Sequence, residues 1–236
     1  MLFVGVGIEG QFGIGVSVRI HDWCKEHRRY LIGGGKDDLG DGRFYNTVFV
    51  VGPDGEIVFK QVKSVPIQFF KDGLAAPSQN VWDSPWGKIG ICICYDLSYR
   101  RVVDPLIKQA ARALIVPFMD VTDWGAHQHQ LHSLVSPLRA KEYGIPIFRT
   151  GSSGISQLVD ADGRVMARGS FAEQGEIIGG TLQLPKRGRL PLDHWLAPAS
   201  VIATVCFATV ICIKQLQVAV RTKKRTPGRA GPSKGY

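Results

Sequence analysis

A run of 19 consecutive residues without a charged side chain divides this chain into unequal parts. The run covers 195–213 and reads WLAPASVIATVCFATVICI. A helix needs about 20 apolar residues to cross the hydrocarbon core of a bilayer. Trp195 stands at the start of the run, where interfacial aromatic residues are common, and a Lys/Arg cluster follows its end. The sequence therefore favours a transmembrane helix over 195–213, and the alternative is a buried helix of a soluble core.

Basic residues are concentrated after this run. Residues 214–236 contain seven of the 29 Lys and Arg residues and none of the 20 Asp and Glu residues. The rest of the chain has 22 basic against 20 acidic residues, so the formal charge of +9 belongs mainly to this tail. A nucleic-acid-binding protein carries its charge on the folded surface, so we expect no nucleic acid partner. The tail is expected to be disordered and, by the positive-inside rule, cytoplasmic, with the preceding domain on the outer face of the membrane.

The part of the chain before the apolar run alternates between strand and helix patterns. The expected strands are the N-terminal run 1–10 and residues 30–34, 44–51, 56–63, 88–93, 114–118, 145–149, 155–160 and 164–168. The expected helices are 17–29, 99–112 and 125–143, the last kinked near Pro137, and 65–86 is expected to be a loop. This order predicts a layered α/β domain over 1–186, followed by a linker over 187–194.

The segment GKIGICICYD, residues 87–96, ends an apolar strand abruptly in a polar turn before a helix. Such a turn exposes a side chain and offers backbone N–H groups to an oxyanion, which suits a nucleophile at Cys94. A thiol of ordinary pKa is only partly ionised at neutral pH, so a neighbouring base or cation must activate it. Cys92 faces the same side of the strand, and a purely structural role is the alternative for either cysteine.

Several motifs in order resemble the carbon–nitrogen hydrolase (nitrilase) superfamily. They are Leu31-Ile-Gly-Gly34 with Tyr45-Asn-Thr47, Gly52-Pro-Asp-Gly55, Val65-Pro66, Cys94-Tyr-Asp96, Pro117-Phe-Met-Asp120, Arg139-Ala-Lys-Glu142, Arg149-Thr-Gly-Ser-Ser-Gly154 and the hairpin of 160–163. The resemblance covers residues 1 to about 186. It implies a four-layer α-β-β-α sandwich that is short at its N-terminus, with one C-terminal transmembrane helix.

The resemblance also implies a Glu–Lys–Cys triad that works through a thioester at Cys94. The lysine is Lys63 or Lys60, which point to opposite faces of a strand, and Lys63 matches the family position before Val-Pro better. Glu9 is the one glutamate at the family's place, although no proline precedes it and the family's first strand and helix are missing. Glu142 is expected to support the lysine or the substrate, and Tyr95 belongs to the cysteine motif.

This set of residues needs no metal or organic cofactor. The implied partners are a small amide or acyl-lipid substrate, the membrane and a second copy of the domain, since superfamily members commonly pair. The layout is similar to the C-terminal part of one branch, the apolipoprotein N-acyltransferases, which suggests hydrolysis of an amide or acyl transfer to an amine. The alternative is a truncated or inactive membrane-tethered domain.

His127, His129 and His132 lack the spacing of helical zinc ligands and are expected at the helix start and surface.

Overall fold

The computed structural model describes residues 2–4, 14–171 and 175–225 of the 236-residue chain. Its backbone divides into two compact units, Met1–Leu190 and Pro191–Tyr236. Residues 187–190 are bonded to the first unit, because the N–H groups of Gly188 and Arg189 donate to the carbonyls of Ala111 and Tyr143. The expected position of Glu9 lies outside the described residues.

Two β-sheets form the centre of the first unit. The first sheet has the order β1-β2-β3-β4, and its strands are Leu2–Val4, Tyr30–Gly40, Arg43–Val51 and Ile57–Val62. The second sheet has the order β10-β9-β8-β7-β6-β5. Its strands in chain order are β5 Val81–Ser84, β6 Gly87–Ile91, β7 Ala113–Phe118, β8 Ile147–Gly151, β9 Gln157–Val159 and β10 Val165–Arg168. The neighbouring strands β6, β7 and β8 are parallel, as strands connected by helices are expected to be.

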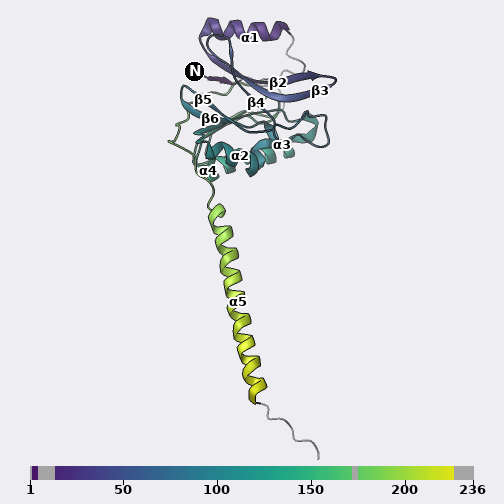
Figure 1. Cartoon of the computed structure of the whole chain (residues 1–236). Helices are drawn as coiled ribbons and strands as arrows, with labels where there is room; N and C mark the ends of the chain where they lie inside the picture. Colours follow the sequence, from purple (N-terminus) through teal and green to yellow (C-terminus); the bar gives the residue numbers. More distant parts are fainter. Residues whose placement is uncertain (1, 5–13, 172–174, 226–236) are drawn as a thin grey trace, which may run out of the picture. The chain divides into compact units, whose positions relative to one another are not determined.

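Helices cover the outer face of each sheet, which makes the unit a four-layer α-β-β-α sandwich (Figure 1). The helix α1, Ile14–His27, lies on the first sheet, and its Cys24 is fully buried. The second sheet is covered by α2, α3 and α4, which span Arg100–Lys108, Gly125–Ser133 and Val135–Tyr143. Two short 3-10 helices follow β6 and β7, namely η1 Cys94–Ser98 and η2 Thr122–Trp124. The expected fold is therefore confirmed.

The strand β7 shows why this chain needs layers on both sides of its second sheet. All six residues of β7 are buried. Leu114 and Val116 point into the core shared with α2 and α4, whereas Ile115 points into the core between the two sheets. A strand that is buried on both faces has a continuous apolar sequence rather than an alternating one, which is what ALIVPF displays.

The structure corrects three details of the expected elements. The segment 125–143 forms two helices that meet at Leu134, and Pro137 lies in the first turn of α4, where a missing N–H breaks no helical hydrogen bond. The strand β2 continues to Gly40 because it pairs with β3 along its whole length. The strand β5 lies inside the segment 65–86 that was expected to be a loop.

The second unit contains one long helix, α5, which spans Asp193–Arg225. Its segment Asp193–Arg221 includes a window with a mean hydropathy of 2.3, and none of that window is buried against protein. By length and composition, this helix is able to cross a membrane. A soluble core helix of the same length would have its apolar face covered by other elements.

Truncation of Ile115 tests the inter-sheet core. We expect Ile115→Ala to lower the free energy of unfolding of the first unit by about 2–5 kcal/mol, because a fully buried isoleucine leaves a cavity between rigid sheets. Urea denaturation of the detergent-solubilised chain, followed by tryptophan fluorescence, measures this change. Val165→Ala on β10 is the control, since Val165 is 42% exposed and should change stability by less than about 0.5 kcal/mol. Equal effects of the two variants would contradict the assigned core.

Candidate active site

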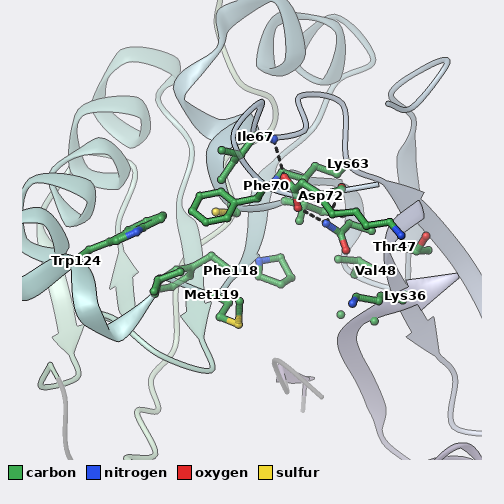
Figure 2. Close-up of a pocket in the computed structure, with 18 residues that line it drawn as sticks. Lys36, Thr47, Val48, Lys63, Ile67, Phe70, Asp72, Phe118, Met119 and Trp124 are labelled. Carbon is green, nitrogen blue, oxygen red and sulfur yellow. Dashed lines mark hydrogen bonds and ion pairs between the residues drawn. The ribbon is translucent and has the colours of Figure 1, made fainter. Parts of the chain in front are cut away.

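A cavity of about 540 Å³ lies in the first unit, where both sheets contribute residues to one space. Its wall includes the glycines of β2, the polar start of β3, the loop between β4 and β5, the turn after β6 and the end of β7 with η2. Figure 2 shows Lys63 and Asp72 on one side of this space and Phe118, Met119 and Trp124 on the other. Both Cys94 and Lys63 line it.

The predicted nucleophile, Cys94, occupies the turn between β6 and η1. Its backbone φ is +52°, in the left-handed region that non-glycine residues seldom adopt. Its side chain is buried except toward the cavity, with 6% of the residue exposed. A strained turn from strand to helix is a recurrent way of presenting a nucleophile. The neighbouring Cys92 is fully buried in the helix-side core and does not line the cavity.

The carboxylate of Asp96 fixes the turn that carries Cys94. This fully buried side chain accepts hydrogen bonds from the backbone N–H groups of Ser64 (3.0 Å), Val65 (2.7 Å) and Ile93 (3.2 Å). Burial raises the pKa of Asp96, while these N–H groups and the nearby Lys63 lower it. Asp96 thus connects the cysteine turn to the residues that directly follow Lys63.

The register of the first sheet decides which of the two candidate lysines reaches the cavity. The backbone N–H of Lys63 donates to Asn46, so Lys63 lies beside Asn46 on the face that looks toward the second sheet. Lys60 pairs with Phe49, three residues further along β3, and therefore lies on the opposite face. It is exposed there and forms an ion pair with Asp37 at 3.3 Å.

Lys63 is held by a carboxylate that the sequence analysis did not single out. Its Nζ lies 2.6 Å from Oδ2 of Asp72, and its side chain is only 3% exposed. Asp72 also accepts hydrogen bonds from the N–H of Ile67, at 2.7 Å, and from the side-chain amide of Asn46. Asp72 lies nine residues after Lys63 in a loop, so no helix or strand periodicity of the sequence indicated that the two side chains meet. Only the bend of that loop back over Lys63 brings the two charges together.

Glu142, on α4, is connected to the short helix that begins at Cys94. Its carboxylate pairs with Arg139 at 2.5 Å, and Arg139 donates to the backbone carbonyls of Leu97 and Ser98 in η1. Glu142 is not among the described residues that line the cavity, and a role in supporting the lysine or the substrate stays a prediction. Tyr95 is 40% exposed and packs edge-to-face on Tyr99, while its backbone N–H is directed at the Cys94 thiol.

A second charged cluster, which we call the Asp120 cluster, lies beside Cys94. It consists of Asp120, His129, His132 and Arg149, and its aspartate and arginine are almost fully buried. His132 Nδ1 lies 2.7 Å from Asp120 Oδ1, and Arg149 approaches the other carboxylate oxygen at 3.5 Å. The Cys94 sulfur, an Asp120 oxygen and a His132 nitrogen all lie within 4.8 Å of one another.

The Asp120 cluster corrects the expected surface position of His129 and His132, whereas His127 is exposed as expected. His129 is fully buried and stacks on Phe171, and the side chain of His132 is only 13% exposed. Thiolate, carboxylate and imidazole are metal-ligand types, but a guanidinium nitrogen of Arg149 lies 3.0 Å from His132 Nδ1 and already supplies a cation there. Burial lowers the pKa of Arg149 to about 10, against the opposing effect of Asp120.

The charges around Cys94 have opposite effects on its acidity. Burial raises the pKa of the Cys94 thiol above its ordinary value, and this is the largest influence. Lys63 and Arg149 lower the pKa because they stabilise the thiolate, whereas Asp120 raises it. The thiol of the free protein is therefore mainly protonated near neutral pH, and its reaction needs a proton acceptor.

Comparisons with known proteins agree with this arrangement. The profile of the Carbon-nitrogen hydrolase family matches residues 16–191. Omega-amidase NIT2-B of Xenopus laevis is 30% identical over an alignment of 172 residues, and the match covers 64% of this chain and 60% of that protein. Apolipoprotein N-acyltransferase of Rhizobium rhizogenes is 30% identical over an alignment of 187 residues, and the match covers 66% of this chain and 34% of that protein. The chain thus spans less than two thirds of the length of either relative.

Solved structures share the fold at low sequence identity. A carbon–nitrogen hydrolase from Helicobacter pylori superposes with a TM-score of 0.61 at 18% identity, covering 69% of this chain and 65% of that one. Nit3 of Saccharomyces cerevisiae, a member of branch 10 of the nitrilase superfamily, gives a TM-score of 0.59 at 20% identity, covering 72% and 65%. These two likenesses support the architecture of the first unit.

Alkylation of Cys94 tests the electrostatics of the cavity. We expect Lys63→Met to raise the pKa of Cys94 and slow its reaction with iodoacetamide at pH 8 by about tenfold, because less thiolate is present. Asp120→Asn should lower the pKa and speed the reaction. Peptide mapping by mass spectrometry across pH 6–10 measures both rates. General damage to the fold would shift the two variants in the same direction, so opposite shifts are the required outcome.

Proposed function

This chain belongs to the carbon–nitrogen hydrolase family, and we propose that it forms a thioester between Cys94 and an acyl group and passes that group to water or to an amine. The observation that carries this proposal is the meeting of Cys94 and Lys63 in one cavity, on segments from different sheets. Such a pair offers a nucleophile and a fixed positive charge to the same carbonyl.

In this proposal the Cys94 sulfur attacks the acyl carbon, and the new C–S bond replaces a C–N or C–O bond. Negative charge develops on the carbonyl oxygen in the tetrahedral intermediate, and the Lys63 ammonium stabilises it. The Lys63–Asp72 ion pair, at 2.6 Å, keeps the ammonium in place before the substrate arrives. A charge that is already oriented needs no reorganisation during the reaction.

The thiol proton needs an acceptor, and we assign that role to Glu9. Glu9 would take the proton from Cys94 and return it to the leaving group, and would then activate the second acyl acceptor. Among the described residues that line the cavity, Asp72 is the one with a carboxylate. Its oxygens already accept hydrogen bonds from Lys63, from the side chain of Asn46 and from the N–H of Ile67. Its assigned role is therefore to hold Lys63.

The shape of the cavity favours an amide or ester with an apolar acyl part. Phe70, Phe118, Met119 and Trp124 line one side, and the rings of Phe70 and Trp124 lie 6.3 Å apart. Next to this side, the loop between β4 and β5 leaves Phe69 91% exposed. An exposed aromatic residue beside an apolar cavity suits entry of an acyl chain from a lipid surface. The omega-amidase and N-acyltransferase relatives correspond to the two substrate classes, a small amide and an acyl-lipid.

We further propose that α5 anchors the protein in a membrane. The helix contains the uncharged run 195–213. The basic residues of 214–236 follow this run, and those up to Arg225 still belong to the helix. Cytoplasmic flanks of transmembrane helices carry an excess of Lys and Arg, so the tail is assigned to the cytoplasm and the catalytic unit to the opposite face.

Intact-protein mass spectrometry tests the thioester. The detergent-solubilised chain, incubated with phospholipid or with small amides, should gain an acyl mass that maps to Cys94, and the mass identifies the donor class. Cys94→Ala should abolish the adduct completely, whereas Cys92→Ala should leave it unchanged, because Cys92 lies in the helix-side core. An adduct that persists in Cys94→Ala contradicts the proposed nucleophile. A folded protein that forms no adduct with any donor would favour a non-catalytic, membrane-tethered role.

The assignment of Glu9 is tested separately. Glu9→Gln should slow adduct formation at Cys94 by about 100-fold or more, since general acid–base groups typically contribute that much. The reaction of Cys94 with iodoacetamide at pH 10, where the solvent removes the proton, should change little. Stopped-flow measurement of both reactions separates a proton-transfer role from a structural one. Unchanged acylation in Glu9→Gln would exclude Glu9 as the base.

A charge placed in α5 tests the membrane anchor. Thr204 lies at the middle of the uncharged run, and Thr204→Arg should lower membrane integration, since arginine at the centre of a spanning helix costs about 2.5–3.5 kcal/mol. Thr204→Leu is the control and should integrate at least as well as the unchanged protein. Extraction of membranes with alkaline carbonate measures the integrated fraction. Equal extraction of both variants would argue against a spanning helix.

A further inference from the structure

The ring nitrogens of His129 are buried without a hydrogen bond. His129 lies on α3, is fully buried and stacks on Phe171 with 3.9 Å between the ring centroids. Neither its Nδ1 nor its Nε2 forms a hydrogen bond with another described residue, although Nδ1 lies 3.5 Å from Oδ2 of Asp120. A buried polar group left without a partner costs about 1–3 kcal/mol. The Asp120 cluster therefore offers an unused ligand atom to whatever binds there.

Three further ligand atoms lie close together beside this histidine. The Cys94 sulfur, a carboxylate oxygen of Asp120 and an imidazole nitrogen of His132 all lie within 4.8 Å of one another. A tetrahedral zinc ion, with bonds of about 2.0–2.3 Å, holds its ligand atoms about 3.3–3.8 Å apart. Side-chain shifts of about 1 Å thus bring the three atoms to the spacing of zinc ligands. Thiolate, carboxylate and imidazole are also the ligand types that zinc takes in proteins.

The fold holds these ligand atoms on three separate segments. Cys94 begins η1 after β6, Asp120 follows β7, and α3 carries His129 and His132 one turn apart. Since β6 and β7 are parallel neighbours, the segments that follow them leave the sheet at the same edge. Position 154 has no room for a side chain, because a Cβ added at Gly154 would lie 2.8 Å from Asp120 Oδ2. The ligand atoms are therefore brought together by the sheet and not by one flexible loop.

Arg149 is the resident cation of the Asp120 cluster, and it competes with a metal ion. Its guanidinium lies 3.0 Å from His132 Nδ1 and 3.5 Å from Asp120 Oδ2. The same group also donates to the carbonyl of Ile155 and lies 3.4 Å from the ring centroid of Phe118. These two contacts still hold Arg149 when it gives up His132, so the exchange does not leave a buried guanidinium without a partner. The competition makes the site exchangeable rather than a permanent metal centre.

We propose that Cys94, Asp120 and His132 bind Zn²⁺, with His129 completing the site, and that this ion reversibly blocks the nucleophile. The ion enters from the cavity, which Cys94 lines. On binding, the S–H bond of Cys94 breaks, an S–Zn bond forms and the proton passes to the solvent. The bound sulfur then has no free electron pair for an acyl carbon. The blocking role rests on the proposed function, whereas the binding of the metal does not.

Cobalt substitution detects the site without any turnover. The detergent-solubilised chain carries no histidine tag, and Cys206 and Cys212 of α5 are replaced by Ala, because these exposed thiols would also bind cobalt. The protein is stripped with a chelator and titrated with Co²⁺. We expect a sulfur-to-cobalt charge-transfer absorption together with the intense visible bands of tetrahedral cobalt. Added Zn²⁺ should displace the cobalt and remove both signals.

Variants identify the ligands. Cys94→Ser should abolish the charge-transfer absorption. His132→Gln, which keeps a hydrogen-bond donor for Asp120, should weaken binding by about 100-fold or more, since loss of even an outer partner costs about 10–100-fold. His127→Gln is the matched control, because His127 is exposed on the same helix, and it should bind like the unchanged protein. A charge-transfer absorption that persists in Cys94→Ser, or equal binding by the two histidine variants, overturns the site.

The same reasoning gives a test for the fourth ligand. His129→Phe keeps an aromatic ring against Phe171 and removes both nitrogens, so it should weaken cobalt binding by at least about tenfold. Tryptophan fluorescence checks that each variant is folded before titration. Unchanged binding by folded His129→Phe overturns the place of His129 in the site.

Alkylation measures the block at the nucleophile. Zn²⁺ should slow the reaction of Cys94 with iodoacetamide in proportion to the bound fraction, and a chelator should restore the rate. The ratio of rates with and without Zn²⁺ cancels any change in thiol acidity, and it should approach one in His132→Gln but not in His127→Gln. If Zn²⁺ protects Cys94 and no donor acylates the metal-free chain, the metal site stands and the proposed catalysis fails. If the metal-free chain is acylated and Zn²⁺ protects Cys94 from neither reagent, the metal site fails and the catalysis stands.

Discussion

The buried carboxylate of Asp96 joins the two segments on which the candidate site depends. It lies two residues after Cys94 and binds the N–H groups of Ser64 and Val65, which directly follow Lys63. A carboxylate without water is very unfavourable unless its oxygens are bonded, and three backbone donors satisfy this one. Because these donors lie just after strands of the two different sheets, hydrogen bonds to a single side chain connect the nucleophile segment to the lysine segment.

The charged side chains nearest to Cys94 form ion pairs of opposite charge. Lys63 is matched by Asp72, and Arg149 by Asp120. Each pair adds little net field, but removal of one partner would leave an uncompensated buried charge, which typically destabilises a protein by about 3–5 kcal/mol. Small changes in either pair alter the acidity of the thiol, because Lys63 and Arg149 lower its pKa and Asp120 raises it.

Local patterns in the sequence predicted the parts of this site that depend on strand geometry. The turn at Cys94 was predicted because Tyr and Asp end an apolar strand. The opposite faces of Lys60 and Lys63 were predicted because side chains alternate along a strand. Contacts made by the tertiary fold escaped prediction. Asp72 reaches Lys63 through the bend of a loop, and His132 on α3 contacts Asp120, twelve residues earlier in the chain and just after β7. The break at Leu134 was missed because the residues buried on the two helices keep one helical spacing across it: His129, Ser133, Ser136, Ala140 and Tyr143.

The pairing of β4 with β3 has a consequence for how such a chain can change during evolution. Loss or gain of one residue within β4 would rotate every later side chain of the strand to the other face, exchanging an inward lysine for an outward one. Changes of two residues would preserve the orientation, and changes in the loop beyond Lys63 would preserve it at any length. Loss or gain of a single residue should therefore be selected against within β4, whereas the loop after Val65 tolerates it up to the point where Asp72 no longer reaches Lys63.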